Sequence, residues 1–343
     1  MKFWDQQREA RSSTRWLLLA FVLCVLAVVA SVHLGLALAW WLGTMAFGGW
    51  DYPTGFTAVN IGVTLLLVLG GCWMELDQLR HGGGSKLAER VGAREARPGS
   101  SLAEQQLCNI VDEMCIAAHW PAPQVTVLAR TDAINAFAAG WDANDAIIAV
   151  TQGALDQLTR EEMQGLVAHE LSHLREGDTR LNMQLASMVF GLELIHNFGE
   201  SMREREAIFT QWFGLFIQAS GFVGWFCGQL LKAAVSRQRE YLADARAVQW
   251  TRSKDGLGGV LRKVLTQREL AQRQYGDWQA DERSYIGLNH RTVQHMLLTE
   301  TPHASRLEDW LESHPSVPER IRRIYGRDMR PLPLPLNTVP VGR

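Results

Sequence analysis

Two long apolar segments occupy the N-terminal part of the chain. No Asp, Glu, Lys or Arg occurs within residues 16–50, and none occurs within residues 52–74. Each segment is long enough to cross the roughly 30 Å hydrocarbon core of a bilayer as a helix, and tryptophans lie at the segment ends, as interfacial aromatic residues do. The pattern predicts a membrane anchor at residues 1–80 with two transmembrane helices, at about 16–42 and 56–74.

An alternative for the first segment is a cleaved signal peptide, because Ala-Leu-Ala at 37–39 resembles a cleavage site. However, the apolar run before this triplet is longer than a signal-peptide core, and a second apolar segment follows at once. We therefore expect both segments to remain in the protein.

A third apolar region lies further along the chain. Residues 208–235 are numerous enough to span a bilayer. Residues 183–198 are a weaker candidate for a membrane span, because Glu193 at mid-membrane would cost about 2.5–3.5 kcal/mol on insertion scales. The two segments form either a membrane hairpin at about 183–235 or two amphipathic helices that lie against a soluble domain.

Between residues 81 and 330 the apolar positions follow helical and strand periods in turn. A glycine-rich hinge at 81–86 is expected to open this domain. Capping patterns predict helices that begin after Ser101 and Thr159, each with a glutamate three residues later. Three short apolar runs predict the strands of a small sheet, at 124–130, 135–140 and 146–150. The domain is therefore expected to be mainly α with a small β-sheet. A proline-rich tail at 331–343 cannot continue a helix and is expected to be polyproline-like or disordered.

The distribution of charge predicts the orientation in the membrane. Basic residues flank the two N-terminal apolar segments and are absent from the loop between them: Lys2, Arg8, Arg11, Arg15, Arg80, Lys86, Arg90, Arg94 and Arg97. The positive-inside rule then places the 81–330 domain in the cytoplasm. The five scattered cysteines suggest no disulfide framework, which agrees with a reducing compartment. The net charge of −2 gives no electrostatic reason to expect nucleic acid as a partner.

The segment GLVAHELSHLREGD, residues 165–178, carries the clearest chemical signal. In a helix, His169 and His173 lie one turn apart on the same face, so both imidazoles can reach one ion. Glu170 projects from a neighbouring angle, close enough to contact a water on that ion without being a ligand. The spacing indicates a zinc site. The alternative is a pair of core histidines whose hydrogen bonds are satisfied within the fold.

Catalytic zinc usually takes three protein ligands and keeps one position for water, so another element must supply a third ligand. The best candidates lie in SRQREYLAD, residues 236–244, where Glu240 and Asp244 are one helical turn apart. One would bind the metal and the other would orient a ligand histidine. The alternative is an exposed helix with charges four residues apart.

Four ordered stretches give the chain a family resemblance. They are NAFAAG at 135–140, HELSH at 169–173, SRQREYLAD at 236–244 and SHPSVPERIRRI at 313–324. Together they resemble the HtpX-like membrane zinc metallopeptidases of gluzincin type, which are relatives of the CAAX prenyl-protein proteases. The family often has a second proline after His-Pro, where this chain has Ser316. That serine can instead N-cap the following helix in a capping box.

The resemblance implies a zincin-like metalloprotease domain anchored by N-terminal transmembrane helices, with one zinc ion per chain. The residues it implies are His169, His173 and Glu240 for the metal, Glu170 and His314 for catalysis, Asp244 and Arg320 around the ligands, and Asn135, Ala136 and Phe137 for an extended substrate.

Each implied role has a chemical reason. Glu170 would take a proton from water and return it to the leaving amine. Asp244 would orient a ligand histidine. His314, with Arg320 nearby, would line the site and help to stabilise the developing oxyanion, although His-Pro before a helix is also an ordinary turn. Residues 135–137 would pair with an extended substrate at a sheet edge, or they form a plain hairpin strand.

The function expected from these features is that of a membrane-anchored zinc endopeptidase. It would be a multi-pass protein of a bacterial-type inner membrane, with its catalytic domain facing the cytoplasm. The lipid bilayer and peptide or protein substrates are the expected partners, and a role in membrane-protein quality control fits them. One alternative is a proteolytically inactive scaffold with structural zinc, which would need no general base at Glu170. Another is a prenyl-peptide processing protease, which differs only in its substrate.

Overall fold

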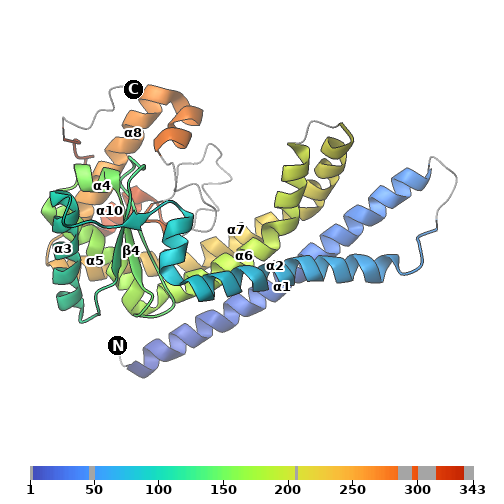
Figure 1. The fold of residues 1–343 in the computed structure, drawn as a ribbon, viewed down its shortest axis with the longest axis horizontal. Coiled ribbons are helices and arrows are strands. Elements are labelled where there is room, and N and C mark those ends of the chain that lie inside the picture. Colours follow the sequence, from blue (N-terminus) through green and yellow to red (C-terminus); the bar gives the residue numbers. More distant parts are fainter. Residues whose placement is uncertain (1–2, 46–50, 205–207, 285–295, 300–313, 336–343) are drawn as a thin grey trace. The chain divides into compact units, whose positions relative to one another are not determined.

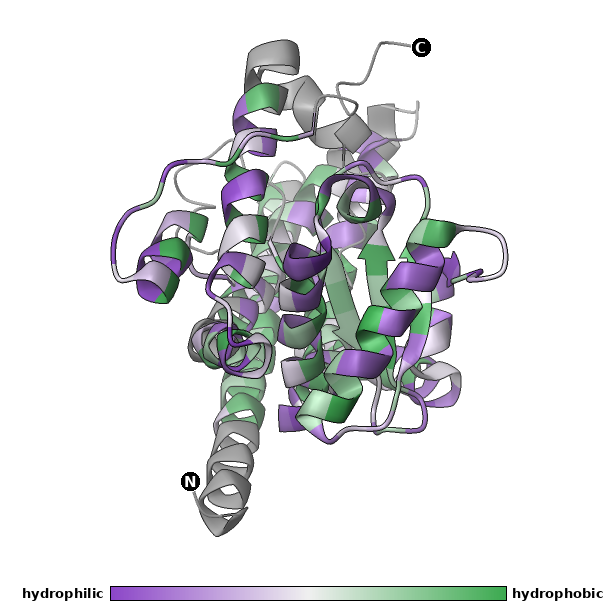
Figure 2. Cartoon of the chain, turned by 90° about the vertical axis from the view of Figure 1, so that its left-hand side faces the viewer, coloured by the Kyte–Doolittle hydropathy of each residue, from purple (hydrophilic) through white to green (hydrophobic). Residues whose placement is uncertain are grey.

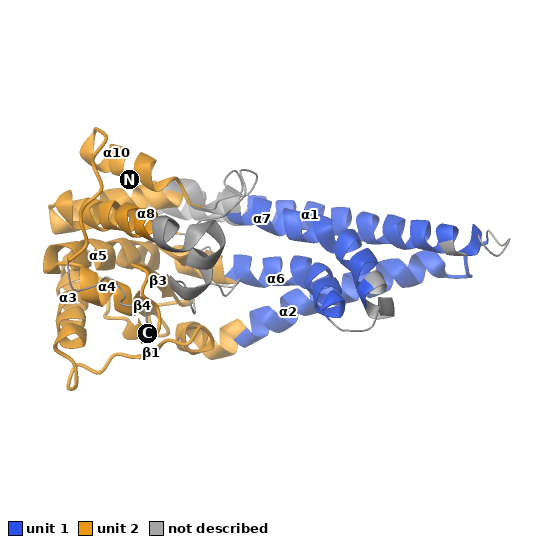
Figure 3. Ribbon diagram, turned by 90° about the horizontal axis from the view of Figure 1, so that it is seen from above, with its two compact units in different colours: residues 1–78, 184–235 blue, residues 79–183, 236–343 orange. Residues whose placement is uncertain are grey.

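The computed structural model describes residues 3–45, 51–204, 208–284, 296–299 and 314–335. These residues form two compact units, which Figure 3 shows in different colours. Unit 1 comprises residues 1–78 and 184–235, and unit 2 comprises residues 79–183 and 236–343.

Unit 1 is built from long helices. They are α1 (Phe3–Met45), most of α2 (Phe56–Arg90), most of α6 (Asp178–Arg203) and the first part of α7 (Ile208–Thr251). Among the described residues, three helical stretches are long and apolar enough to cross a membrane: Trp16–Leu42, Phe56–Arg90 and Gly214–Lys232. Large apolar side chains on these helices face outward, and Leu66 is 72% exposed. Such a surface suits lipid rather than water.

Helices α6 and α7 of unit 1 pack very closely against one another. A side chain at Gly224 would collide with the carbonyl oxygen of Leu192, and one at Gly221 would collide with the backbone of His196. Glycine at such positions lets two helix backbones approach, as in helix pairs within membranes. The carboxylate of Glu193 lies buried in this unit, 3.5 Å from Lys232 Nζ and 3.4 Å from Gln229 Nε2. A buried acid on α6 therefore has its partners on α7.

The glycine-rich stretch at 81–86 was expected to be a hinge, and the helical geometry of α2 breaks within it. Helix α2 runs through it to Arg90 with a kink at Gly83, whose φ of 60° lies in the region that favours glycine. The next residue, Gly84, packs against the carbonyl oxygens of Ala139 and Asp145 and has no room for a side chain. The backbone conformation at Gly83 and the packing at Gly84 therefore both require glycine here.

Unit 2 contains one four-stranded sheet in the order β1-β2-β4-β3. Its strands are β1 (Arg94–Glu95), β2 (Gln124–Leu128), β3 (Ala136–Ala139) and β4 (Ile147–Thr151). Strands β2 and β4 are parallel, whereas β1 and β3 pair antiparallel with their neighbours. The expectation of a mainly α protein with a small sheet is confirmed. The two-residue strand β1 is too short to leave an alternating pattern in the sequence, and it was not predicted.

Helices cover this sheet and form the core of unit 2. They are α3 (Leu102–Ala118), α4 (Gln152–Gln157), α5 (Arg160–Glu176), α8 (Asp255–Ser284) and α10 (Val317–Tyr325). Helix α5 contacts α3, α8 and strands β3 and β4 (Figure 1). Figure 2 shows hydrophobic strands behind helices whose outward faces are largely hydrophilic. Helix α5 therefore lies in the middle of the unit.

One local detail at the C-terminal end differs from the sequence-based expectation. Ser316 precedes α10, but its side chain makes no capping hydrogen bond, and a proline in the first turn helps to start the helix instead. The described part of the proline-rich tail is ordered against α8, because Thr266 Oγ donates to Leu332 O at 2.6 Å and Arg262 Nε donates to Arg330 O at 2.7 Å. Residues 336–343 of the tail lie outside the described chain.

Candidate metal centre

Helix α5 places His169 and His173 on a buried face. Its start is fixed by a complete capping box, in which Thr159 N donates to Glu162 Oε2 at 2.7 Å and Thr159 Oγ accepts from Glu162 N. Lys263 of α8 donates to the same Glu162 oxygen at 2.6 Å. The helix is thus held against α8 with both histidines inward, and they are 1% and 9% exposed.

The three predicted ligands converge on one point. The Nε2 atoms of His169 and His173 lie 3.3 Å apart. Helix α7 brings Glu240, whose Oε2 lies 3.5 Å from His169 Nε2 and whose Oε1 lies 3.4 Å from His173 Nε2. A tetrahedral zinc ion with bonds of about 2.0–2.1 Å holds its ligand atoms about 3.3 Å apart. Two imidazole nitrogens and a carboxylate at these separations fit one zinc ion.

Asp244 lies one turn beyond Glu240 on α7 and faces the other nitrogen of His169. Its Oδ1 is 3.1 Å from His169 Nδ1. Arg320 of α10 donates to both oxygens of Asp244, at 2.6 and 2.9 Å, and lies 3.3 Å from Glu240 Oε2. A third donor of Arg320 reaches Leu298 O at 2.7 Å. The fully buried Arg320 thus balances the charge of two buried carboxylates. Its donors are taken up by acceptors of the protein, so it holds the residues around the site in place.

Sequence reasoning missed Asp178, which serves His173 as Asp244 serves His169. Asp178 Oδ2 is hydrogen-bonded to His173 Nδ1 at 3.0 Å, and Asp178 Oδ1 forms an ion pair with Arg239 of α7. The available signal was an acidic residue directly after Gly177, which ends α5 in a left-handed conformation with φ 77°. An acidic residue at a helix start is common for other reasons, so the signal was weak.

Glu170 lies beside the three converging side chains, and its carboxylate accepts no hydrogen bond from the described residues. The residue is 1% exposed, and neither oxygen has a hydrogen-bond partner among the described residues. A buried carboxylate without partners is costly, so its persistence points to a group outside the chain. Burial raises the pKa of Glu170, and the nearby His169 and His173 partly offset this rise. A raised pKa makes it easier for one carboxyl group both to accept and to donate a proton.

The structure places His314 at the same cluster. His314 Nδ1 lies 3.3 Å from Glu240 Oε2, and the residue is buried just before α10. Burial alone would raise the pKa of Glu240, but His314 and Arg320 hold it well below its ordinary value. Glu240 is therefore ionised, as a ligand of a cation must be.

The predicted substrate strand lies at the edge of the sheet, next to α5. At its outer edge, however, β3 already has a neighbour (Phe137 bridges Leu297 antiparallel, and Leu298 N donates to Ala136 O at 3.0 Å). The side chain of Asn135 donates to Thr299 O at 2.8 Å. Residues 296–299 thus take the position in which an extended peptide would pair with residues 135–137.

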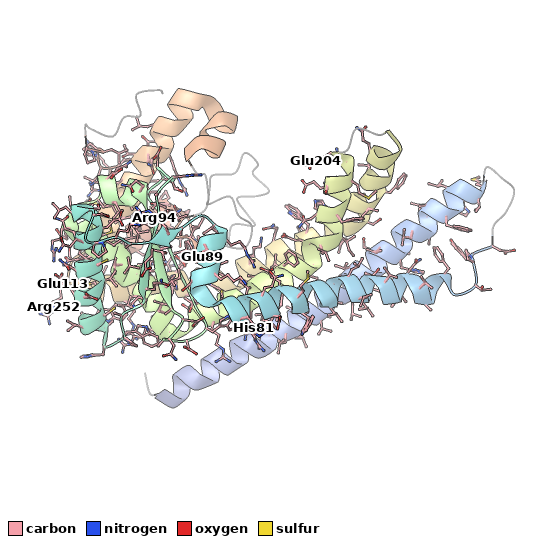
Figure 4. The ribbon with its side chains drawn as sticks, in the orientation of Figure 1. His81, Glu89, Arg94, Glu113, Glu204 and Arg252 are labelled. Atoms are coloured by element: carbon pink, nitrogen blue, oxygen red, sulfur yellow. The ribbon has the colours of Figure 1, made fainter. Side chains whose placement is uncertain are left out.

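The cluster differs sharply from the charged surface around it. Glu89, Glu113 and Arg252, labelled in Figure 4, lie on the outside of unit 2 and are exposed. Exposed pairs such as Glu113 with Arg160 are screened by water and contribute little. The candidate metal centre, by contrast, brings His, Asp, Glu and Arg side chains together in a buried position.

Comparison with known proteins agrees with this geometry. Residues 101–328 match the family described as peptidase family M48. The chain is 33% identical to a "Protease HtpX homolog" of Dictyoglomus thermophilum over 64% of this chain and 68% of that protein. A protein of the same description from Thermoanaerobacter pseudethanolicus is 30% identical over 82% of this chain and 88% of its own length.

A third relative extends the similarity to nearly the whole chain. The "Protease HtpX homolog" of Levilactobacillus brevis is 26% identical over 94% of this chain and 98% of its own length. No solved structure matches the chain significantly. The range matched by the family, residues 101–328, spans every residue of the candidate metal centre.

Proposed function

The chain belongs to peptidase family M48, and from this we propose that it is a membrane-anchored, HtpX-like zinc endopeptidase. The observation that carries the proposal is the convergence of two imidazole nitrogens and the Glu240 carboxylate beside the unpartnered carboxylate of Glu170. In this proposal His169, His173 and Glu240 hold the single ion. A structural zinc site would need no buried acid beside it, so Glu170 favours a peptidase over an inactive scaffold.

The residues divide the chemistry among them. When bound, zinc would polarise the scissile carbonyl and lower the pKa of a water molecule towards about 7. Glu170 accepts the proton of the attacking water on a carboxylate oxygen and then donates it to the nitrogen of the leaving amine. Asp244 holds His169 in a fixed orientation, and His314 donates a hydrogen bond towards the developing oxyanion.

Substrates in this proposal are extended segments of membrane or misfolded proteins. The backbone of residues 135–137 pairs with such a segment by strand addition at the outer edge of β3. Because residues 296–299 occupy that edge, pairing requires that they separate from β3 when substrate binds. A role in membrane-protein quality control fits a substrate of this kind. The relatives are described as proteases, which supports cleavage of peptide bonds by this chain.

Replacing Glu240 tests the function. Glu240→Ala removes the only charged ligand of the proposed site, so we expect zinc affinity to fall by more than the roughly 10–100-fold that loss of a supporting residue causes. Cleavage of an unfolded polypeptide by the purified full chain in detergent should be lost with the metal. Glu269→Ala, at an exposed glutamate of α8, is the control and should match the wild type. Full zinc content with normal cleavage in Glu240→Ala would refute the proposed ligand set.

We also propose that α6 and α7 cross the membrane as a hairpin, which gives four spans. The ligands His173 and Glu240 share one ion, so the chain between them must cross an even number of times. Gly214–Lys232 has the length and hydropathy of a span, and it therefore needs a second crossing beside it. The close glycine contacts support α6 as that partner, because they let the two helices pack together. The Glu193–Lys232 pair supports it as well, because pairing lowers the cost of an acid in the bilayer.

A cysteine at the tip of the hairpin tests this topology. In a background that lacks the five native cysteines, Ser201→Cys on intact cells should react with a membrane-impermeant thiol reagent. Thr54→Cys, in the loop expected outside, should also react, whereas Ser100→Cys in the cytoplasmic domain should react only after lysis. Protection of Ser201→Cys together with Ser100→Cys would show two spans instead of four.

A further inference from the structure

Both ligand histidines have a carboxylate behind them, and an arginine holds each carboxylate. Behind His169 stand Asp244 and Arg320, with Asp244 Oδ1 3.1 Å from His169 Nδ1. Behind His173 stand Asp178 and Arg239, with Asp178 Oδ2 3.0 Å from His173 Nδ1. The two arrangements come from different elements, since α10 supplies Arg320 and α7 supplies Arg239. The family resemblance pointed to the first arrangement only.

The local fold explains how Asp178 reaches His173. Gly177 ends α5 with φ 77°, its N–H bonds back to His173 O and Leu174 O, and α6 begins at Asp178. The reversal leaves the first side chain of α6 beside the last turn of α5. Asp178 is only 6% exposed, so its contact with His173 is shielded from water.

The same helix that carries the proposed third ligand also restrains Asp178. Arg239 directly precedes Glu240 on α7, and its guanidinium pairs with the Asp178 oxygen that does not face His173. One oxygen of Asp178 is therefore held by the arginine while the other accepts from the imidazole. This division fixes the carboxylate in direction as well as in position.

A neutral imidazole can carry its proton on either nitrogen, and only an unprotonated nitrogen can bind a metal. A carboxylate that accepts from Nδ1–H keeps the lone pair on Nε2, the atom that faces His169 and Glu240. We propose that Asp178, held by Arg239, is a positioning residue that fixes the tautomer and ring orientation of His173 for zinc binding. This inference rests on the proposed zinc site and adds a residue to it.

The test is the zinc affinity of three variants of the full chain in detergent. Asp178→Ala should bind zinc about 10–100-fold more weakly than the wild type and release it faster to a chelator. Asp178→Asn should lie between the two, because its amide oxygen can still accept from Nδ1–H but carries no charge. The control is Glu176→Gln, which removes an ion pair with Arg246 of α7 at the same end of α5 without touching a histidine. Its zinc affinity should be that of the wild type.

A second readout separates positioning from a general loss of stability. With cobalt in place of zinc, Asp178→Ala and Asp178→Asn should shift the visible absorption bands, which report the ligand geometry, whereas Glu176→Gln should not. Unchanged zinc release and an unchanged cobalt spectrum in both Asp178 variants would overturn the inference and leave the zinc site intact. A wild-type chain that binds neither metal would instead contradict the proposed function itself.

Discussion

Glu170→Gln should abolish peptide-bond cleavage while leaving zinc in place. Proton transfer by a positioned side chain contributes roughly 10²–10⁴-fold to a rate, and the same carboxylate serves both the attack of water and the departure of the amine. We therefore expect a fall of several orders of magnitude in kcat. Because Glu170 is not one of the three converging ligands, metal content should stay at the wild-type value. The measurement is single-substrate kinetics alongside metal analysis of the same preparation.

The matched control lies on the same helix. Glu161→Gln makes the same chemical change at an exposed position in the first turn of α5 and should keep wild-type kinetics. The amide of Glu170→Gln has almost the shape of the carboxylate, so the fold should be preserved. A zinc-replete Glu170→Gln protein with turnover close to wild type would remove Glu170 from the mechanism.

A disulfide between positions 137 and 297 should switch the enzyme off reversibly. Phe137 and Leu297 face each other across an antiparallel bridge, and residues that face each other in this way have Cα atoms about 4.5–5.5 Å apart, which a disulfide can span. In a background that lacks the native cysteines, Phe137→Cys with Leu297→Cys should form this bond on oxidation. Residues 296–299 would then be unable to leave β3, so an extended substrate could not pair there. We expect near-complete loss of cleavage and recovery on reduction.

The reduced form of the same double variant is its own control, because it carries both substitutions without the crosslink. Both positions are buried, so the reduced protein must first show cleavage. Leu298→Pro gives an independent measurement, since it removes the N–H that donates to Ala136 O and should speed cleavage by loosening the segment. Equal activity in the oxidised and reduced forms would show that substrates do not pair with β3 at Phe137.

Local sequence signals predicted the elements that carry the site. The capping pattern at Thr159 predicted the start of α5. The spacing of His169 and His173 predicted that both lie on one face of that helix, because helical geometry alone determines this. The same argument placed Glu240 and Asp244 on one face of another helix. Their approach to the histidines came from the family resemblance and from the ligand count of zinc, since spacing within a helix cannot say what the helix faces.

The features that sequence could not predict depend on contacts between distant segments. Residues 296–299 pair with β3 although their sequence, Met-Leu-Leu-Thr, shows no strand alternation. Asp178 looks like an ordinary acidic residue at a helix start until the turn at Gly177 brings it to His173. The glycines at 82–84 predicted a hinge and α2 does kink at Gly83, but the sequence could not show that Gly84 packs against Ala139 and Asp145. Each of these contacts depends on tertiary packing, which local preference does not encode.

Arg320 shows why the hydrogen bonds around the proposed ligands could be predicted only in part from the sequence. The family resemblance alone placed Arg320 near the site. Its hydrogen bonds to Asp244 and Leu298 join three separate segments, and no local pattern encodes such a junction. Breaking a buried charge network by removing one partner typically costs about 3–5 kcal/mol, so this junction also holds the domain together.

X-ray absorption at the zinc K-edge, on the purified full-length chain in detergent, tests the metal centre most directly. The proposed site predicts one zinc ion per chain with a first shell of nitrogen and oxygen atoms at about 2.0–2.2 Å, including the outer-shell scattering of two imidazoles. A chain that binds no zinc would contradict the proposed function. So would a shell that contains sulfur at about 2.3 Å, because that ion would be held by cysteines instead of His169, His173 and Glu240.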